Sequence, residues 1–280
     1  MTRSSQKGFT LTEVVICLLL GSMVAGAVIK VMISNDVTLK LNQALASVQE
    51  NGRFGIARLR ADLLYTGMYQ DRPEAPADAF DKGEEAQFVR HHPVILPGTF
   101  TKRPQLGSLQ GEAGASDTLV VARQSRRDCR GYTLGYDGQQ PVFIVNEYYV
   151  EGTALKCRGF DGRFLRGQKD AEGHNRHAGF TLLDDVYSFQ VLYGQLIMAD
   201  ENEPVLRYVT ADNIVDKSRI VSLRLALLLK GDGEVFIDPV PAFSLLNESP
   251  FTPDENRLFK QFETTITLRN VLYMNGLQHS

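Results

Sequence analysis

The stretch "KGFTLTEVVICLLLGSMVAGAVIKVM", residues 7–32, decides how this chain is built. Between residues 9 and 33 the only charged side chains are those of Glu13 and Lys30. A helix over these residues extends for about 37 Å, more than the roughly 30 Å of a bilayer's hydrocarbon core. A charge inside such a segment costs about 2.5–3.5 kcal/mol on insertion scales, so Glu13 is expected to have a function. We predict a membrane-spanning helix with a functional carboxylate near its start.

Basic residues come before this helix and set its orientation. Arg3 and Lys7 precede the apolar run, so the positive-inside rule predicts a cytoplasmic N-terminus and an exported remainder. In a secretory signal peptide the cleavage site follows the apolar region, which is then lost. Here the candidate cleavage point, between Gly8 and Phe9, comes first. The apolar helix is therefore expected to stay in the mature chain.

The helical pattern continues beyond the membrane. Apolar residues recur at steps of three and four, which is typical of a helix with one buried face. The stripe consists of Leu41, Leu45, Val48, Gly52, Ile56, Leu59 and Leu63. We expect one helix from residue 9 to about residue 65. Residues 9–33 would span the membrane, and the amphipathic residues 34–65 would pack on a globular head.

The remaining residues, 66–280, predict a β-rich head. Residues 70–115 are rich in Pro, Gly, Asp and Glu and are expected to form loops. Segments that alternate or are β-rich follow, without helical patterns between them, which favours antiparallel pairing. They are residues 117–123, 140–150, 186–193, 219–230 and 262–269. The predicted fold class is α+β, with a long N-terminal helix packed on an antiparallel β-sheet head.

Composition limits the possible functions. The chain has 280 residues and a formal net charge of −3, without a basic stripe, so strong nucleic-acid binding is not indicated. It contains no Gly-rich phosphate loop. No Ser/His/Asp or Cys/His arrangement and no paired catalytic carboxylates can be assembled from it. We therefore expect neither enzymatic activity nor a cofactor.

Several polar clusters favour surface structure over binding sites. His174 and His177 could share a helical face, but neighbouring glycines favour a loop, and no third metal ligand is near. His91 and His92 precede a proline and are expected in a polar loop. The acidic residues 199–204 lack the alternation of a calcium loop and favour a hairpin tip. The basic residues 123–130 indicate a solvated strand end, with contact to a partner or DNA as the alternative. No metal site is predicted.

The chain has three cysteines. Cys17 lies in the apolar run and is expected to behave as a hydrophobic residue. Cys129 and Cys157 lie in the exported part, where oxidation is favoured, and could pair with each other or remain separate thiols. Their spacing fits neither a zinc ribbon nor a CxxC redox motif. A bridge between them would contribute about 3.5 kcal/mol in the chain-entropy model.

The string "KGFTLTEVVICLLLG" resembles the class III leader of type IV pilins and type II secretion pseudopilins. The resemblance implies that a prepilin peptidase removes residues 1–8 by cutting after Gly8 and methylates the new N-terminal Phe9. It also implies that Glu13 pairs with the Phe9 amine of a neighbouring subunit. Since a misplaced subunit would leave a buried charge unpaired, Glu13 would then control assembly register.

Segments of the head resemble one pilin subfamily, the PilW-type minor pilins. These segments are "QENGRFGIARLRADL", "ASDTLVVAR", "YYVEGTALKCRG", "LLDDVYSFQVLYG" and "TTITLRN", in the family's order. The chain departs from that family at "LLYTGMYQD", where a cysteine is frequent, so the disulfide arrangement can differ. A helix-kinking proline, usual near Lys30 in major pilins, is absent here.

The resemblance implies a structural function. The chain would help initiate type IV pilus assembly and would be incorporated at or near the pilus tip, supporting twitching, adhesion or DNA uptake. Its implied partners are other minor pilins, the major pilin, the prepilin peptidase and a tip adhesin. It would be a single-pass inner-membrane protein with a periplasmic head before it enters the extracellular pilus. The alternative is a J-type pseudopilin of type II secretion, which has the same leader and stalk.

Overall fold

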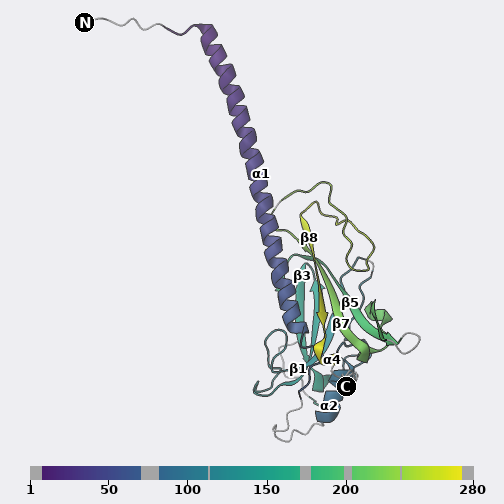
Figure 1. Ribbon diagram of the computed structural model, residues 1–280. Coiled ribbons are helices and arrows are strands. Elements are labelled where there is room, and N and C mark those ends of the chain that lie inside the picture. Colours follow the sequence, from purple (N-terminus) through teal and green to yellow (C-terminus); the bar gives the residue numbers. More distant parts are fainter. Residues whose placement is uncertain are drawn as a thin grey trace.

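The computed structural model describes residues 8–70, 82–112, 114–170, 178–198, 204–233 and 235–272. A long helix projects from a β-rich head, and its N-terminal end lies far from that head (Figure 1). The helices are α1 (Leu11–Leu63), α2 (Lys82–His91), α3 (Gly162–Leu165) and α4 (Arg269–Leu272). The strands are β1 (Leu119–Ser125), β2 (Val142–Glu151), β3 (Ala154–Asp161), β4 (Phe180–Leu183), β5 (Val186–Met198), β6 (Pro204–Val209), β7 (Ile220–Lys230) and β8 (Phe259–Thr267). The fold is α+β, as the sequence predicts.

Helix α1 has 53 residues and is about 80 Å long. Its observed ends lie within two residues of the predicted ones, the usual uncertainty of helix boundaries. The predicted apolar stripe is the face that meets the head. The buried residues of α1 are Ala44, Val48, Gly52, Gly55, Leu59 and Leu63. The described residues before Ala44 contribute none of them, so the helix is buried only in its C-terminal half.

The strands form two four-stranded antiparallel sheets instead of one. The first has the order β1-β2-β3-β4, and the second has the order β6-β5-β7-β8. A turn at Asp184 and Asp185 separates them, and Asp185 has a positive φ of 57° there. The sequence pattern predicts the regions of β1, β2, β5, β7 and β8. It misses β3, and also β4, which has only four residues. It misses β6 as well, whose first four residues are all exposed and therefore carry no alternation of burial.

The main core lies where α1 and both sheets meet. Its members include Leu59 and Leu63 of α1, Tyr148 of β2, and Leu223 and Leu225 of β7. A second cluster joins α2 to the other face of the first sheet. A third lies between the second sheet and the residues that connect β7 to β8. One helix thus holds the two sheets together, and the head is a single packed unit around its end.

Residues 70–115 are not all loop, which corrects the prediction for this region. The helix α2 lies within them, with Glu84 and Glu85 in its first turn and Arg90 and His91 in its last. Such charges favour a helix because they complement its dipole. Glu85 is fully buried and pairs with Arg163, at 2.7 Å from Oε2 to Nε. Composition does not predict α2, because part of the contact between α2 and the head is a buried ion pair and not an apolar stripe.

Candidate functional site

The start of α1 is organised by a reciprocal pair of hydrogen bonds. Thr10 is the N-cap, with an extended backbone, and its Oγ1 accepts a bond from the Glu13 amide at 3.3 Å. The Glu13 carboxylate in turn accepts bonds from the Thr10 amide and the Thr10 hydroxyl, each at 2.9 Å. This is a capping box, in which each residue satisfies a backbone donor that the helix leaves free. The structure therefore holds the Glu13 carboxylate at the very start of the helix, against Thr10.

Gly8 and Phe9 lie before the helix, in the open. Phe9 is 88% exposed, and a Cβ atom built on Gly8 would meet nothing within 4 Å. Both residues that flank this bond are exposed. Cutting it would leave a primary amine on Phe9, one residue before the N-cap and one helical turn from the Glu13 carboxylate. The two charges would then lie at the same end of the same helix.

The first half of α1 presents apolar side chains in all directions. Its most apolar window has a mean hydropathy of 2.4, and none of that window is buried against the rest of the chain. The exposed residues include the consecutive Leu18, Leu19 and Leu20, which point to different sides of the helix because each residue turns it by about 100°. Such a surface is stable only in hydrocarbon or against other apolar helices. This half of α1 is therefore long and apolar enough to anchor the chain in a membrane.

The second half of α1 approaches the head so closely that only glycine fits at two positions. A Cβ atom on Gly52 would lie 2.2 Å from the Phe262 ring of β8. A Cβ atom on Gly55 would lie 2.6 Å from Leu183 of β4. Both glycines occupy the buried stripe of the helix. They let the helix backbone pack against one strand from each sheet.

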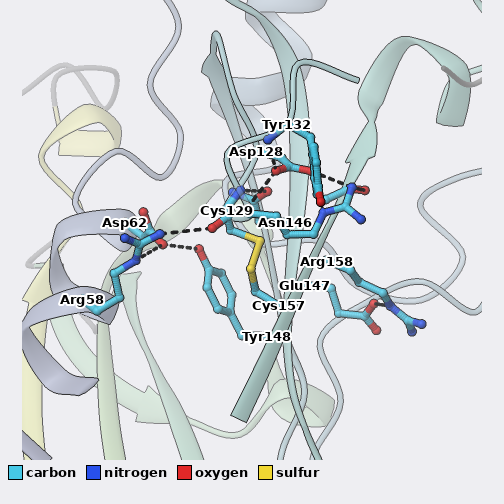
Figure 2. The surroundings of a disulfide bond; sticks show 12 residues. Arg58, Asp62, Asp128, Cys129, Tyr132, Asn146, Glu147, Tyr148, Cys157 and Arg158 are labelled. Carbon is cyan, nitrogen blue, oxygen red and sulfur yellow. Dashed lines mark hydrogen bonds and ion pairs between the residues drawn. A yellow bond between two sulfur atoms is a disulfide. The ribbon is translucent and has the colours of Figure 1, made fainter. Parts of the chain in front are cut away.

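Polar contacts attach the end of α1 to the disulfide loop (Figure 2). Arg58 donates from Nη2 to the backbone carbonyl of Cys129 at 3.2 Å. Its Nε atom lies 3.6 Å from Oδ2 of Asp62, one turn further along the helix. The buried Arg123 donates to the Asp62 carbonyl at 2.7 Å. Tyr148 donates to the Asp62 carboxylate at 3.5 Å, and burial raises the pKa of its hydroxyl, with the Asp62 charge adding to the effect.

Cys129 and Cys157 form a disulfide, with Cα atoms 6.3 Å apart. Cys157 lies on β3 opposite Tyr148 of β2, whereas Cys129 lies in the loop that follows β1. The bridge is buried and belongs to the core shared by α1 and both sheets. The Cys129 amide donates to the Asn146 side chain of β2 at 3.2 Å. The disulfide thus fixes the loop after β1 to the middle of the first sheet, where the stalk also contacts it.

Asp128 organises the loop around this bridge. Its carboxylate accepts bonds from the amides of Arg130 and Tyr132 at 2.8 and 3.0 Å. It also receives the Arg130 guanidinium at 2.7 Å, and both side chains are fully buried. A Cβ atom on Gly159 of β3 would lie 2.3 Å from Asp128, so this loop packs directly on the strand. A buried charge is tolerable here because it is paired and hydrogen-bonded on several sides.

The basic residues 123–130, predicted to be a solvated strand end, are partly internal, which corrects that prediction. Arg123 is 7% exposed and the Arg130 side chain is not exposed, whereas Arg126 and Arg127 are exposed. His91 is the last residue of α2 instead of a loop residue, and His92 stacks on Phe88 with ring centroids 4.4 Å apart. Two of the four arginines in residues 123–130 thus serve the fold of the head.

The remaining predicted clusters are only partly testable. His174, His177 and residues 199–203 lie outside the described residues. Within the part of the chain that the structure does describe, no group of three or more His, Cys, Asp or Glu side chains could hold a metal ion.

Asp117 joins the two sheets in a way that sequence patterns do not reveal. Its carboxylate accepts bonds from the amides of Gly111 and Val191, each at 2.7 Å, and its own amide donates to the Phe189 carbonyl of β5 at 2.8 Å. Burial raises the pKa of this carboxyl group to about 6, and the negative charges of Glu248 and Asp212 add to the rise. Here a side-chain carboxylate accepts backbone hydrogen bonds that a neighbouring strand would otherwise accept. Such a contact leaves no periodic pattern in the sequence. The Thr10–Glu13 capping box, by contrast, could have been found from its T-x-x-E spacing.

Comparisons with known proteins give two family matches and a similarity among solved structures. The profile of the family described as Type IV Pilus-assembly protein W matches residues 142–270. The profile described as the prokaryotic N-terminal methylation motif matches residues 3–29. Among solved structures, a type IV-like pilin from Thermus thermophilus is similar, with 14% identity and a TM-score of 0.34. That match covers 59% of this chain and 83% of the Thermus chain. The comparison with curated proteins gives no match.

Proposed function

Since its head carries the PilW domain behind a pilin methylation motif, the chain belongs with the PilW-type minor pilins, and we propose that it helps initiate type IV pilus assembly. It would enter the filament at or near the tip, beside other minor pilins and the major pilin. Before assembly it would reside in the inner membrane with its head in the periplasm. Its contribution to twitching, adhesion or DNA uptake would follow from that position.

The observation that carries the proposal is the contrast along α1. An apolar half with no contact to its own head is joined, without a break, to a half that is packed into the head. A helix used only as a membrane anchor needs no carboxylate at its start. Glu13 is held there by its capping box, within one turn of the amine that cleavage after Gly8 would create. This pairing of charges at one end suits a subunit that leaves the lipid to join other helices.

We assign the register role to Glu13 on electrostatic grounds. In an apolar bundle, its carboxylate and the Phe9 amine of a neighbouring subunit would attract each other strongly. A shift of one helical turn would separate the charges and leave both buried without partners, which costs several kcal/mol. Gly21, Ser22, Ala25 and Gly26 in the same half form two pairs of small residues, each four residues apart, and such pairs allow helices to approach closely.

The initiation role is tested in cells that lack this chain but retain the other subunits. We expect few or no pili in the sheared fraction and an accumulation of major pilin in the inner membrane. Complementation with the wild-type chain should restore pili, and complementation with Gly8→Val should not, because the precursor would stay uncleaved. Intact-mass analysis of the complemented strain should find an N-terminal methylated Phe9. Normal piliation with a defect in protein secretion would contradict the proposal and favour a J-type pseudopilin.

A further inference from the structure

The two sheets have four outer strands, which differ in what lies against them. Strand β8 lies against α1, where Phe262 contacts Gly52. Strand β4 is short and ends at Leu183 under the same helix. The outer edge of β1 is bonded by residues 93–95: the Ala122 amide donates to Pro93, and the Ile95 amide donates to Val120. Covering of this kind is how proteins prevent strand edges from pairing with other chains.

Strand β6 has no bonded outer edge within the described part of the chain. It pairs with β5 on one side, from Val209 opposite Tyr193 to Pro204 opposite Met198. Among the described residues, no backbone hydrogen bond outside that ladder involves its residues. Its first four residues are exposed, and Val205 and Leu206, on opposite faces, are each 45% exposed. Pro204 interrupts the edge only at its first residue, so the rest remains able to pair.

The surroundings of β6 favour a peptide partner with a particular charge. Arg207 is exposed and forms no ion pair within the described residues. A groove of about 470 Å³ lies beside it, lined by Ile197 of β5, Arg207 and the 89% exposed Val215. A strand added to β6 would satisfy its free backbone groups and place alternate side chains over this groove. A carboxylate opposite Arg207 would form a favourable cross-strand pair.

We propose that β6 is a docking edge, where an extended segment of another exported subunit adds as a fifth strand with an acidic residue opposite Arg207. A second copy of this chain is a poorer occupant on the same reasoning. If two β6 strands paired about an axis at Leu206, Arg207 would lie opposite Val205 of the copy. The sequence of β6, "PVLRYV", offers no carboxylate in any register. The charge of Arg207 therefore favours a different chain as the partner of β6.

This inference rests on the proposed function only in that the head meets another exported subunit. The test uses the full-length chain in piliated cells, with a benzophenone amino acid at Leu206. The matched control carries it at Phe180 of β4, which is 51% exposed. We expect a crosslinked product at Leu206 alone, mapped by mass spectrometry to a strand that carries an acidic residue. Arg207→Glu should reduce its yield about tenfold, whereas Arg207→Lys should retain most of it.

The outcomes separate this inference from the proposed function. Conversion of the mapped acidic residue to Lys should restore the yield with Arg207→Glu. The inference is overturned if the Leu206 product does not exceed the Phe180 control, maps to a helix, joins two copies of this chain, or is unchanged by Arg207→Glu. Recovery of the chain in sheared pili in any of these cases would leave the proposed function intact. Absence of the wild-type chain from pili would contradict the proposed function itself.

Discussion

The two halves of α1 belong to one continuous helix, yet they differ in how apolar side chains are distributed and buried. In the first half, apolar residues surround the helix and none is buried within the chain. In the second half, a single stripe is buried and the other faces are polar or exposed. The first half therefore depends on lipid or on neighbouring subunits for its stability, whereas the second depends on the head. Substitutions in the second half should change unfolding of the head, and equivalent ones in the first half should change assembly alone.

Removal of the disulfide should give the largest difference in head stability between a substitution in the head and one in the first half of α1. Replacing Cys129 and Cys157 with Ser should lower the free energy of unfolding of the head by about 3.5 kcal/mol, because the unfolded chain loses a closed loop. Cys17→Ser, in the exposed half, is the matched control and should leave head stability unchanged. Denaturant unfolding of the detergent-solubilised chain, followed by near-ultraviolet circular dichroism of its tyrosines, measures both. Equal stability of the two variants would contradict the structural role of the bridge.

The pH dependence of the head should come in part from Asp117. Its folded-state pKa of about 6 lies above its ordinary value of 3.8, so the folded head holds this proton more tightly than the unfolded chain does. This group's contribution to stability is therefore largest below pH 4 and falls as the pH rises to about 6, by about 3 kcal/mol in total.

Asp117→Asn removes this titration and should flatten the unfolding free energy between pH 4 and pH 6 relative to the wild-type chain. The comparison of the two proteins cancels the other carboxyl groups of the head, which titrate in both. Parallel pH profiles for wild type and variant would show that Asp117 does not titrate as its burial requires. A steeper loss on acidification in the wild type would reverse the predicted sign.

Two glycines of the same helix give the most direct contrast in packing. Gly52→Ala should destabilise the head by about 2 kcal/mol, because overpacking against the Phe262 ring outweighs the helix propensity gained from alanine. Gly21→Ala meets no atom within 4 Å in the chain itself and should leave head unfolding unchanged. The same denaturant titration compares them. A stable Gly52→Ala head would mean that Phe262 moves aside without cost.

Most of this contrast could be predicted from the sequence, because it depends on local periodicity. The apolar run and the stripe from Leu41 to Leu63 specify the two halves of α1, and alternation specifies β5 and β7. The sequence did not predict α2, since the buried pair of Glu85 with Arg163 joins residues far apart in the chain. The same holds for Asp117, whose partners lie on β5. Polar contacts between residues far apart in the chain produce no periodic pattern in the sequence.

The candidate site was predictable to a similar degree. The positions of Gly8, Phe9 and Glu13 follow from the leader pattern, whereas the attachment of Arg58 and Asp62 to the disulfide loop follows only from the folded head. The pairing of Cys129 with Cys157 was left open by spacing and is resolved by the distance between β3 and the loop after β1.

The central claim is that Glu13 acts through its charge when subunits associate, and one comparison tests it most directly. Glu13→Gln keeps an acceptor for the Thr10 amide, so it preserves the capping box while removing the charge. Glu13→Val removes both. The measurement is the amount of chain in sheared pili relative to the inner membrane, in cells expressing wild type, Glu13→Gln or Glu13→Val. Our account predicts that both variants are cleaved, remain in the membrane and are depleted from pili. Incorporation of Glu13→Gln at the wild-type level would contradict it and leave Glu13 with a capping role alone.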